Sequence, residues 1–350
     1  MIRLFLLLFF ALAPFGPAWA QRSDECLRPP TQDLADYKEA YVPQEFHWES
    51  FNWEIADLLV LAALLAIASL LSLRHFQRRW FTALISIALL YFGILRGGCI
   101  CPVGATTNFF MGLAAPEMIG KLVAVLFLLP LITAFFFGRV FCSSACPLGA
   151  IQHLISRKNG IQLPTWLNKI LRLIPIAVLI ATAWGALRSG IFLACKLDVY
   201  KPIFFTGHAW VGQLADRFGE GSMEPGLLMA GDWISWLILL AVLALGFYIP
   251  RPFCRFACPY GVLLGLFSRV GLRKRHIDAA SCFKCVQCTK TCPVQAITAD
   301  KDKRNVKVSD FHCVQCGRCD VTCKADSFQS PSPFPDSRFP SIGKKTSQKR

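Results

Sequence analysis

Charged side chains are scarce in this chain of 350 residues, and acidic ones are the scarcest. Asp, Glu, Lys and Arg together make up 17% of the residues, against about 25% in an ordinary soluble domain. Hydrophobic residues make up 54%, which is above the roughly 45–50% that is typical of such domains. These two departures exclude a purely soluble protein.

The sequence also lacks the motifs of several functional classes. It has no paired carboxylates, nucleophile triad or phosphate-binding loop, so hydrolytic chemistry has no candidate residues. No nucleic-acid-binding motif accompanies the formal net charge of +15, and we expect no nucleic-acid partner. None of the six His residues lies in the middle of an apolar run. Haem b in a helical bundle needs paired His ligands on facing helices, so we expect no haem.

Five apolar runs predict an all-α membrane bundle over residues 53–268. The runs are 55–73, 80–95, 122–137, 173–187 and 233–250. Several are near the lower limit of about 17 residues for a helix that crosses the hydrocarbon core. Basic residues follow the first, third and fifth runs, which places those segments and the C-terminal region in the cytoplasm. The intervening segments 96–121 and 188–232 then face outward.

The N-terminus resembles a secretory signal peptide over residues 1–20. Arg3 supplies a positive start, an apolar run follows, and Ala18 and Ala20 form a small-x-small cleavage site. The alternative is a first membrane helix that is never removed. In both cases the short polar segment 21–52 lies outside the cytoplasm.

Eight Cys residues in the last quarter of the chain carry the strongest signal. They form two runs with the spacing C-x2-C-x2-C-x3-C, which is the spacing of bacterial two-cluster ferredoxins. Because each C-x2-C-x2-C loop wraps three corners of an iron–sulfur cube, the fourth thiolate comes from the other run. The predicted first quartet is Cys282, Cys285, Cys288 and Cys323, and the predicted second quartet is Cys313, Cys316, Cys319 and Cys292. Zinc sites use four ligands rather than eight in two matching runs.

Residues 269–326 are therefore predicted to form an α+β ferredoxin domain that binds two [4Fe–4S] clusters. Basic side chains surround its cysteines. They fit contact with anionic lipid headgroups on the cytoplasmic side, or a docking face for an acidic redox partner. The Pro- and Ser-rich basic tail, residues 327–350, is expected to be disordered.

A second cysteine pattern, R-x-F-C-x3-C-P-x-G, occurs twice. One copy starts at Arg139, after the third apolar run, and the other at Arg251, after the fifth. The copies supply Cys142, Cys146, Cys254 and Cys258, which we expect at the cytoplasmic membrane surface. If the two copies are adjacent, these thiols suffice for a third cluster, or they form a redox-active dithiol. Cysteines that only pack inside a bundle are the remaining alternative.

A shortened copy of the element follows the second apolar run and contains Cys99 and Cys101. Topology places this pair on the outward face, where it could pass electrons on, or handle copper or a disulfide. Cys26 and Cys195 are also expected outside, as packed thiols or halves of a disulfide. All four outward thiols could instead meet at one metal site.

The run Gly104-Ala105-Thr106-Thr107 is similar to sequences in which FMN is esterified to a threonine. The acidic residue expected upstream of that modification is missing. We therefore do not expect covalent FMN.

The apolar runs, the C-x3-C-P elements and the two-cluster ferredoxin together resemble the NosR/NapH-type membrane polyferredoxins, over residues 53–326. The resemblance implies a multi-pass protein of the bacterial inner membrane with a cytoplasmic ferredoxin domain. It also implies electron transfer between the quinol pool or a cytoplasmic donor and a periplasmic reductase, such as those for nitrous oxide or nitrate. Because the segment 21–52 cannot be the outward flavin domain of NosR, the chain looks like a shortened NosR-like form. A separate flavoprotein could take that domain's place.

Two other functions stay open at this point. The chain could be an assembly or redox-sensing factor for a periplasmic metalloenzyme, with the outward Cys99 and Cys101 handling metal or disulfide. It could also be a quinol dehydrogenase with its own turnover, although the cysteine pattern favours a component of electron transfer.

Overall fold

The structure is a computed structural model of the chain. It describes residues 53–73, 78–96, 101–114, 121–156, 160–188, 199–205, 233–278, 281–300, 306–323, 325 and 327–329. The predicted signal peptide, the segment 21–52 and most of the predicted tail lie outside these ranges. Cys26, Cys99 and Cys195 also lie outside them.

Apolar helices form at all five places where the sequence predicts them. They are α3 (Trp53–Leu73), α4 (Arg78–Ala88) continued by the π-helix η2 (Leu89–Leu95), α6 (Lys121–Phe137), α10 (Ile174–Arg188) and α13 (Trp233–Tyr248). Among the described residues, two stretches are long and apolar enough to cross a membrane, Ile55–Ser72 and Thr165–Leu187. The other apolar helices are shorter. The helical fold is thus confirmed, while five membrane crossings remain a prediction.

Shorter helices fill the space between the apolar ones, and the apolar runs alone did not indicate them. They are α5 (Pro102–Ala114), α7 (Phe141–Ser144), α8 (Pro147–Ile155), α9 (Thr165–Leu171), η4 (Lys201–Phe205), α14 (Pro252–Phe256) and α15 (Pro259–Val270). The helices α5, α8 and α15 each begin with a Pro that directly follows a Cys. Proline suits this first helical position because its missing N–H would have no partner in the helix.

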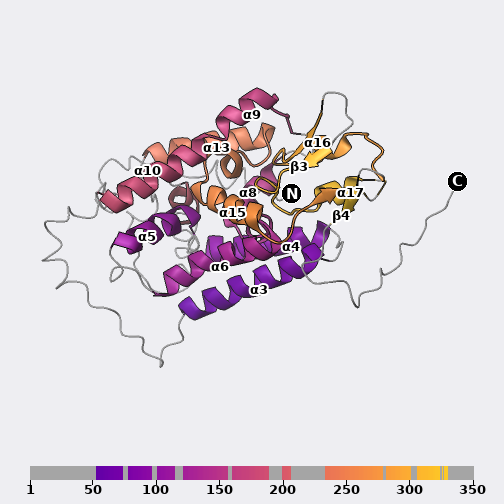
Figure 1. The fold of residues 1–350 in the computed structure, drawn as a ribbon. Coiled ribbons are helices and arrows are strands. Elements are labelled where there is room, and N and C mark those ends of the chain that lie inside the picture. The colour runs from indigo at the N-terminus through magenta and orange to yellow at the C-terminus, as the bar shows by residue number, and fades with distance from the viewer. Residues whose placement is uncertain are drawn as a thin grey trace, which may run out of the picture.

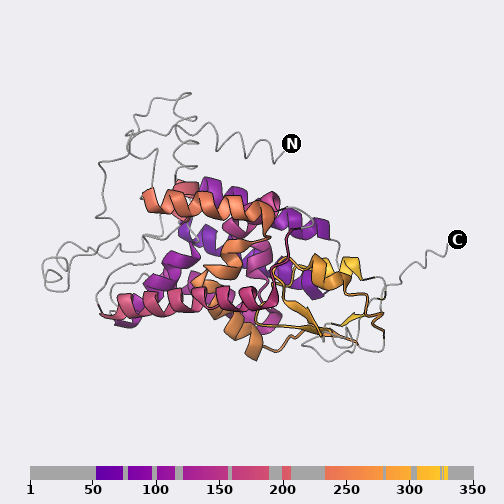
Figure 2. The ribbon, with the colours of Figure 1, turned by 90° about the horizontal axis from the view of Figure 1, so that it is seen from above.

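The second complete cysteine element leads into a helix that lies beside α6. Tyr260 at the start of α15 donates a hydrogen bond to the carbonyl of Phe127 in the middle of α6 (2.7 Å). Leu272, just after α15, donates to the carbonyl of Phe135 near the end of α6 (3.0 Å). Thus α15 runs alongside α6 in the same direction, and Cys258 lies level with the middle of α6. The chain turns back after α13 and starts a new helix inside the bundle (Figure 2), and the position of these elements at the cytoplasmic membrane surface stays a prediction.

The ferredoxin region has the expected α+β character and lies at one end of the helical body (Figure 1). Its strands pair antiparallel in two small sheets, β1 (His276–Ile277) with β4 (Phe328–Gln329) and β2 (Ile297–Ala299) with β3 (Val306–Val308). Helices α16 (Gln287–Thr291) and α17 (Arg318–Thr322) pack against each other. Because Phe328 is buried in the core, the folded region continues past the predicted boundary at residue 326.

Side chains of the helical body hold the ferredoxin region in place through its backbone carbonyls. The contacts are Arg139 to Phe311 (3.0 Å), Ser268 to Asp310 (3.0 Å) and Arg172 to Val294 (2.8 Å) and Gln295 (2.9 Å). The carbonyls of residues 294 and 295 follow Cys292, and those of residues 310 and 311 precede Cys313. The helical body therefore forms hydrogen bonds with the part of the ferredoxin region that contains most of the second quartet.

Candidate functional site

The two C-x2-C-x2-C loops follow the same backbone path. In each loop the residues on either side of the middle cysteine have positive φ angles. These residues are Lys284 (56°), Val286 (51°), Gln315 (53°) and Gly317 (66°). Left-handed residues in such a loop turn successive N–H groups toward a common centre that favours an anion. A β-branched residue rarely adopts this conformation, so the path of the first loop is maintained against strain at Val286.

The structure brings the cysteines of the second quartet into electrostatic contact. Cys313 interacts with Cys292 and Cys316, and Cys319 interacts with Cys313 and Cys316. Burial raises the pKa of the Cys313 thiol to about 12 and also raises the pKa of Cys292. Thiols this buried keep their protons until a metal replaces them, since the thiolate is the form that binds metal. The four cysteines of the predicted second quartet therefore lie close together, and their binding of a cluster stays a prediction.

The first quartet is more open to solvent. Cys288 interacts with Cys282 and Cys285, and burial raises the pKa of the Cys288 thiol to about 11. Cys285 is exposed. Cys323 follows α17 with its Sγ 3.9 Å from the Ser327 hydroxyl, and its assignment to this quartet stays a prediction.

Across the part of the chain that the structure describes, no three Cys, His, Asp or Glu side chains form a group that could hold one metal ion. The prediction that the ferredoxin thiols bind clusters rather than zinc rests on their spacing in the sequence.

The two copies of the repeated cysteine element meet inside the helical body. Cys254 interacts electrostatically with Cys142, Cys146 and Cys258, and Cys258 interacts with Cys142 and Cys146. We call these four residues the membrane cysteine site. Their proximity meets the condition that the third-cluster hypothesis set, namely that the two copies lie side by side.

The C-P-x-G part of each element is the start of a helix, and a thiol caps two of the three starts. The Gly149 N–H at the start of α8 donates to Cys146 Sγ (3.4 Å), and the Gly104 N–H at the start of α5 donates to Cys101 Sγ (3.3 Å). Cys258 takes the matching position before α15, but its side chain accepts no cap hydrogen bond. A helix N-terminus stabilises a thiolate through its partial positive charge. A cysteine at this position is therefore stabilised in its thiolate form, which is the form that binds metal.

Two buried arginines accompany the membrane cysteine site. Arg139 is 4% exposed and Arg251 is 2% exposed, and the Nε of each has no hydrogen-bond partner. Arg139 NH2 lies 3.8 Å from Cys142 Sγ. Where both partners are described residues, the ion pairs are Arg96 with Asp57 and Arg275 with Asp320, and neither Arg139 nor Arg251 pairs with a carboxylate among them. A buried cation without a counter-charge is costly, and four thiolates around an iron–sulfide core would supply negative charge.

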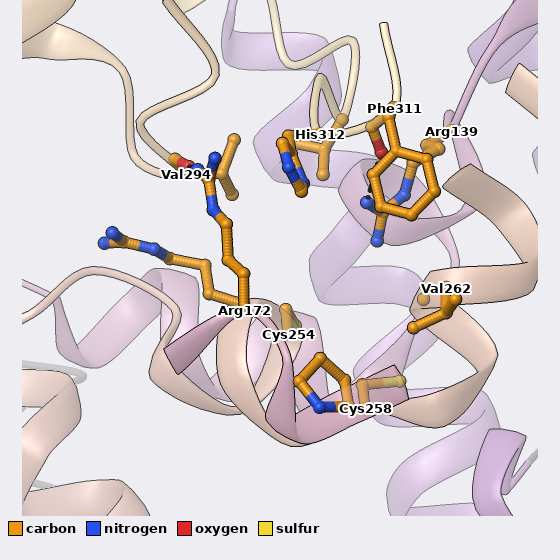
Figure 3. Close-up of a pocket in the computed structure, with 12 residues that line it drawn as sticks. Arg139, Arg172, Cys254, Cys258, Val262, Val294, Phe311 and His312 are labelled. Carbon is orange, nitrogen blue, oxygen red and sulfur yellow. Dashed lines mark hydrogen bonds between the residues drawn. The ribbon is translucent and has the colours of Figure 1, made fainter. Parts of the chain in front are cut away.

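A cavity of about 20 Å³, room for about one water molecule, is lined by Cys254 and Cys258 of the membrane cysteine site and by His312, the residue before Cys313 of the second quartet. Figure 3 shows Cys254 and Cys258 on one side of it and His312 on the other, with the guanidinium groups of Arg139 and Arg172 beside it. Burial and the nearby arginines lower the pKa of His312 to about 3, so this imidazole is neutral near pH 7. The positive charge that lines this cavity therefore comes from arginines rather than from His312.

Sequence reasoning missed Tyr200, which comes from a segment without any motif. Its hydroxyl lies 3.2 Å from Cys146 Sγ, and the residue is 1% exposed. Tyr200 also interacts electrostatically with Cys258 and Cys101. The described member of the outward pair therefore lies near the membrane cysteine site, a relationship that no spacing could indicate.

The hydroxyl groups of the two threonines of α5 form hydrogen bonds within their own helix. The hydroxyl of Thr106 donates to the carbonyl of Pro102 (2.7 Å), and that of Thr107 donates to the carbonyl of Val103 (3.2 Å). Both residues are buried. The expectation that the chain carries no covalent FMN stays a prediction.

A protein-family model described as a 4Fe-4S binding domain matches residues 119–174 and 232–278. These two ranges contain both copies of the repeated cysteine element. They end before Cys282, the first cysteine of the ferredoxin runs. The match therefore attaches a 4Fe-4S description to the part of the chain that contains the membrane cysteine site.

Three relatives cover different shares of the chain. An uncharacterized protein of Methanocaldococcus jannaschii is 27% identical over 245 residues, which are 69% of this chain and 90% of its own length. The ferredoxin-type protein NapH of Haemophilus influenzae is 27% identical over 63% of this chain and 70% of its own length. The regulatory protein NosR of Pseudomonas aeruginosa is 24% identical over 84% of this chain and 40% of its own length. No solved structure matches the chain significantly. The paired 4Fe-4S segments and these relatives place the chain among the NosR/NapH-type polyferredoxin membrane proteins.

Proposed function

We propose that this iron–sulfur electron-transfer protein holds three clusters in a row. The row consists of the first quartet, the second quartet and the membrane cysteine site. One observation carries the proposal: the two repeats bring four thiols together beside two buried arginines that have no carboxylate partner in the described structure. A bound [4Fe–4S] cluster supplies the ability to take up and release an electron.

The burial of the cysteines suggests where electrons enter. Cys285 of the first quartet is exposed, and Phe283 beside it is 76% exposed. Lys284 and Lys290 are also exposed next to this quartet. An apolar contact within a basic rim suits a reduced partner with an acidic face. Such a partner, or the quinol pool, would deliver electrons on the cytoplasmic side.

The remaining route leads away from the ferredoxin region into the helical body. The second quartet is adjacent to the cavity lined by Arg139, Arg172 and Arg255, and Cys254 and Cys258 line the same cavity. Beyond the membrane cysteine site, Tyr200 interacts with Cys101. Because α3 and α9–α10 are long and apolar enough to cross a membrane, we infer a multi-pass protein of the inner membrane. A periplasmic reductase or flavoprotein would accept the electrons.

Iron and sulfide analysis of the purified chain tests the proposal. Three cubes contain about twelve irons, and two contain about eight. The variant Cys142→Ser/Cys254→Ser should lose about four irons and one electron paramagnetic resonance (EPR) signal while the ferredoxin signals remain. The variant Ser143→Ala, which changes a buried neighbour of Cys142 but no thiol, is the matched control. About eight irons in the wild-type chain would disprove the third cluster and leave a dithiol at the membrane cysteine site.

A further inference from the structure

Tyr200 is held rigidly against the membrane cysteine site. Its ring packs on Phe204 with 5.1 Å between the centroids, and Phe204 in turn fits against Gly93 of η2. Val199, Ile203 and Phe204 beside Tyr200 are buried. The hydroxyl at the tip of this packed ring lies 3.2 Å from Cys146 Sγ, so the contact is fixed by the fold.

The chemistry of the site decides which atom donates. A cysteine sulfur that binds iron is a thiolate and has no proton. The Tyr200 hydroxyl must therefore donate, and Cys146 Sγ accepts from Tyr200 as well as from the Gly149 N–H. Hydrogen bonds to a charged acceptor are stronger than those between neutral groups.

A second tyrosine at the same site provides a contrast. Tyr260 interacts electrostatically with Cys142, Cys146 and Cys258, but its hydroxyl donates to the carbonyl of Phe127 (2.7 Å). Tyr260 therefore borders the site without donating to a sulfur in the described structure. Only the hydroxyl of Tyr200, of these two, can stabilise negative charge on a ligand directly.

Burial alone would make this site hard to reduce. Adding an electron adds negative charge, and charge is disfavoured in an apolar interior. Hydrogen bonds to the sulfurs and nearby positive charge oppose that effect and raise the reduction potential. Tyr200 supplies such a hydrogen bond, and Arg139 and Arg251 supply the positive charge.

We infer that Tyr200 is a positioning residue that raises the reduction potential of the membrane cysteine site, so that electrons pass to it from the second quartet. The inference rests on the proposed function, because it needs a cluster at that site. In this step one electron leaves the reduced centre at the second quartet and reduces the centre at the membrane cysteine site by one electron. No bond forms or breaks, and Tyr200 keeps its proton.

A potentiometric titration of the full chain, followed by EPR, tests this inference. In Tyr200→Phe the signal of the membrane cysteine site should shift to a lower midpoint potential, while the ferredoxin signals keep theirs. Tyr260→Phe removes a hydroxyl from the same site without removing a sulfur hydrogen bond, so it should leave the midpoint close to that of the wild type. Both variants should keep about twelve irons per chain.

The outcomes separate this inference from the proposed function. A Tyr200→Phe chain with full iron and an unchanged midpoint would overturn the tuning role and leave three clusters in place. Loss of about four irons in Tyr200→Phe would show that the residue is needed to assemble the site, which also contradicts tuning. About eight irons in the wild-type chain would instead overturn the proposed function itself.

Discussion

Arg139 and Arg251 occupy the same position in the two copies of the cysteine element, and each reaches the other copy. Arg251 NH1 donates to the carbonyl of Cys142 (2.8 Å), and the charge of Arg251 acts on Cys146. Conversely, the Arg139 guanidinium interacts electrostatically with Cys258. Each copy therefore supplies a cation to the thiols of the other, and neither copy completes the site alone.

This exchange predicts that Arg139→Gln and Arg251→Gln each deplete the membrane cysteine site of iron. A neutral amide leaves the negative charge of the bound group unbalanced, and the cost of an unpaired buried charge is several kcal/mol. We expect a loss approaching about four irons per chain, the content of one cube, with the ferredoxin signals retained. Lysine in place of either arginine should restore part of the loss because it keeps the charge.

The matched control for these variants is Arg269→Gln. Arg269 lies in the last turn of α15 and is exposed, so its charge is not part of the buried site. Its iron content should equal that of the wild type. Full iron in both Arg139→Gln and Arg251→Gln would show that the site needs no cationic compensation.

The apolar helices could be predicted from sequence because their signal is local. The runs that predicted α3, α6 and α13 are continuous, and the structure places the helices within a few residues of them. The short helices α8 and α15 could not be found this way. Their starts at Pro147 and Pro259 were interpreted as ends of spans, since nothing in the sequence tells whether the chain leaves the bundle or turns back into it.

Some residues of the candidate site could also be predicted from local sequence patterns, and others could not. Cysteine spacing predicts which thiols can wrap one cluster, and the repeat predicts a joint site of Cys142, Cys146, Cys254 and Cys258 only if the two copies are adjacent. Tyr200 lies 54 positions from its partner Cys146, and a single tyrosine carries no pattern. Contacts between such distant residues depend on tertiary packing, so only the structure could reveal them.

The strain at Val286 leads to a prediction about the first ferredoxin loop. Val286 has a φ of 51°, and Gly317 takes the matching position in the second loop with a φ of 66°. A left-handed residue other than glycine costs about 1–2 kcal/mol, and glycine costs about 0.5–1 kcal/mol in chain entropy. Val286→Gly should therefore stabilise the loop by roughly 0.5–1 kcal/mol, and Gly317→Val should destabilise the other loop by a similar amount.

Urea-induced loss of the visible iron–sulfur absorbance measures both effects. The control is Gln287→Ala, in the first turn of α16, which has an exposed side chain and ordinary helical backbone. If Val286→Gly loses its clusters sooner than the wild type, the loop does not hold strain at this residue.

Gly138 provides a prediction about the contact between the helical body and the ferredoxin region. Its φ is 76°, and a Cβ added there would lie 2.9 Å from Nε2 of Gln315. Gly138→Ala should therefore weaken the docking of the ferredoxin region, at a cost of about 1–2 kcal/mol from the backbone alone plus the clash. Limited proteolysis should release the ferredoxin region faster in this variant.

The double variant Gly138→Ala/Gln315→Ala separates the clash from the backbone cost. Gln315 also accepts a hydrogen bond from Arg275 (2.9 Å), so Gln315→Ala alone has its own cost. If the clash contributes, the double variant is less destabilised than the sum of the two single ones. Strict additivity would show that the cost of Gly138→Ala is conformational only.

The proposed electron route also predicts that its two ends lie on opposite sides of the membrane. Lys307 is an exposed residue of β3, and Ser222 lies in the segment that charge places outside. A membrane-impermeant maleimide should label Lys307→Cys only in inverted vesicles and Ser222→Cys only in spheroplasts, above the background of the unaltered chain. Labelling of both from one side would contradict a transmembrane route. The second quartet would still lie beside the membrane cysteine site, because the contacts through Arg139 and Arg172 do not depend on orientation, and the protein would then exchange electrons at one membrane face.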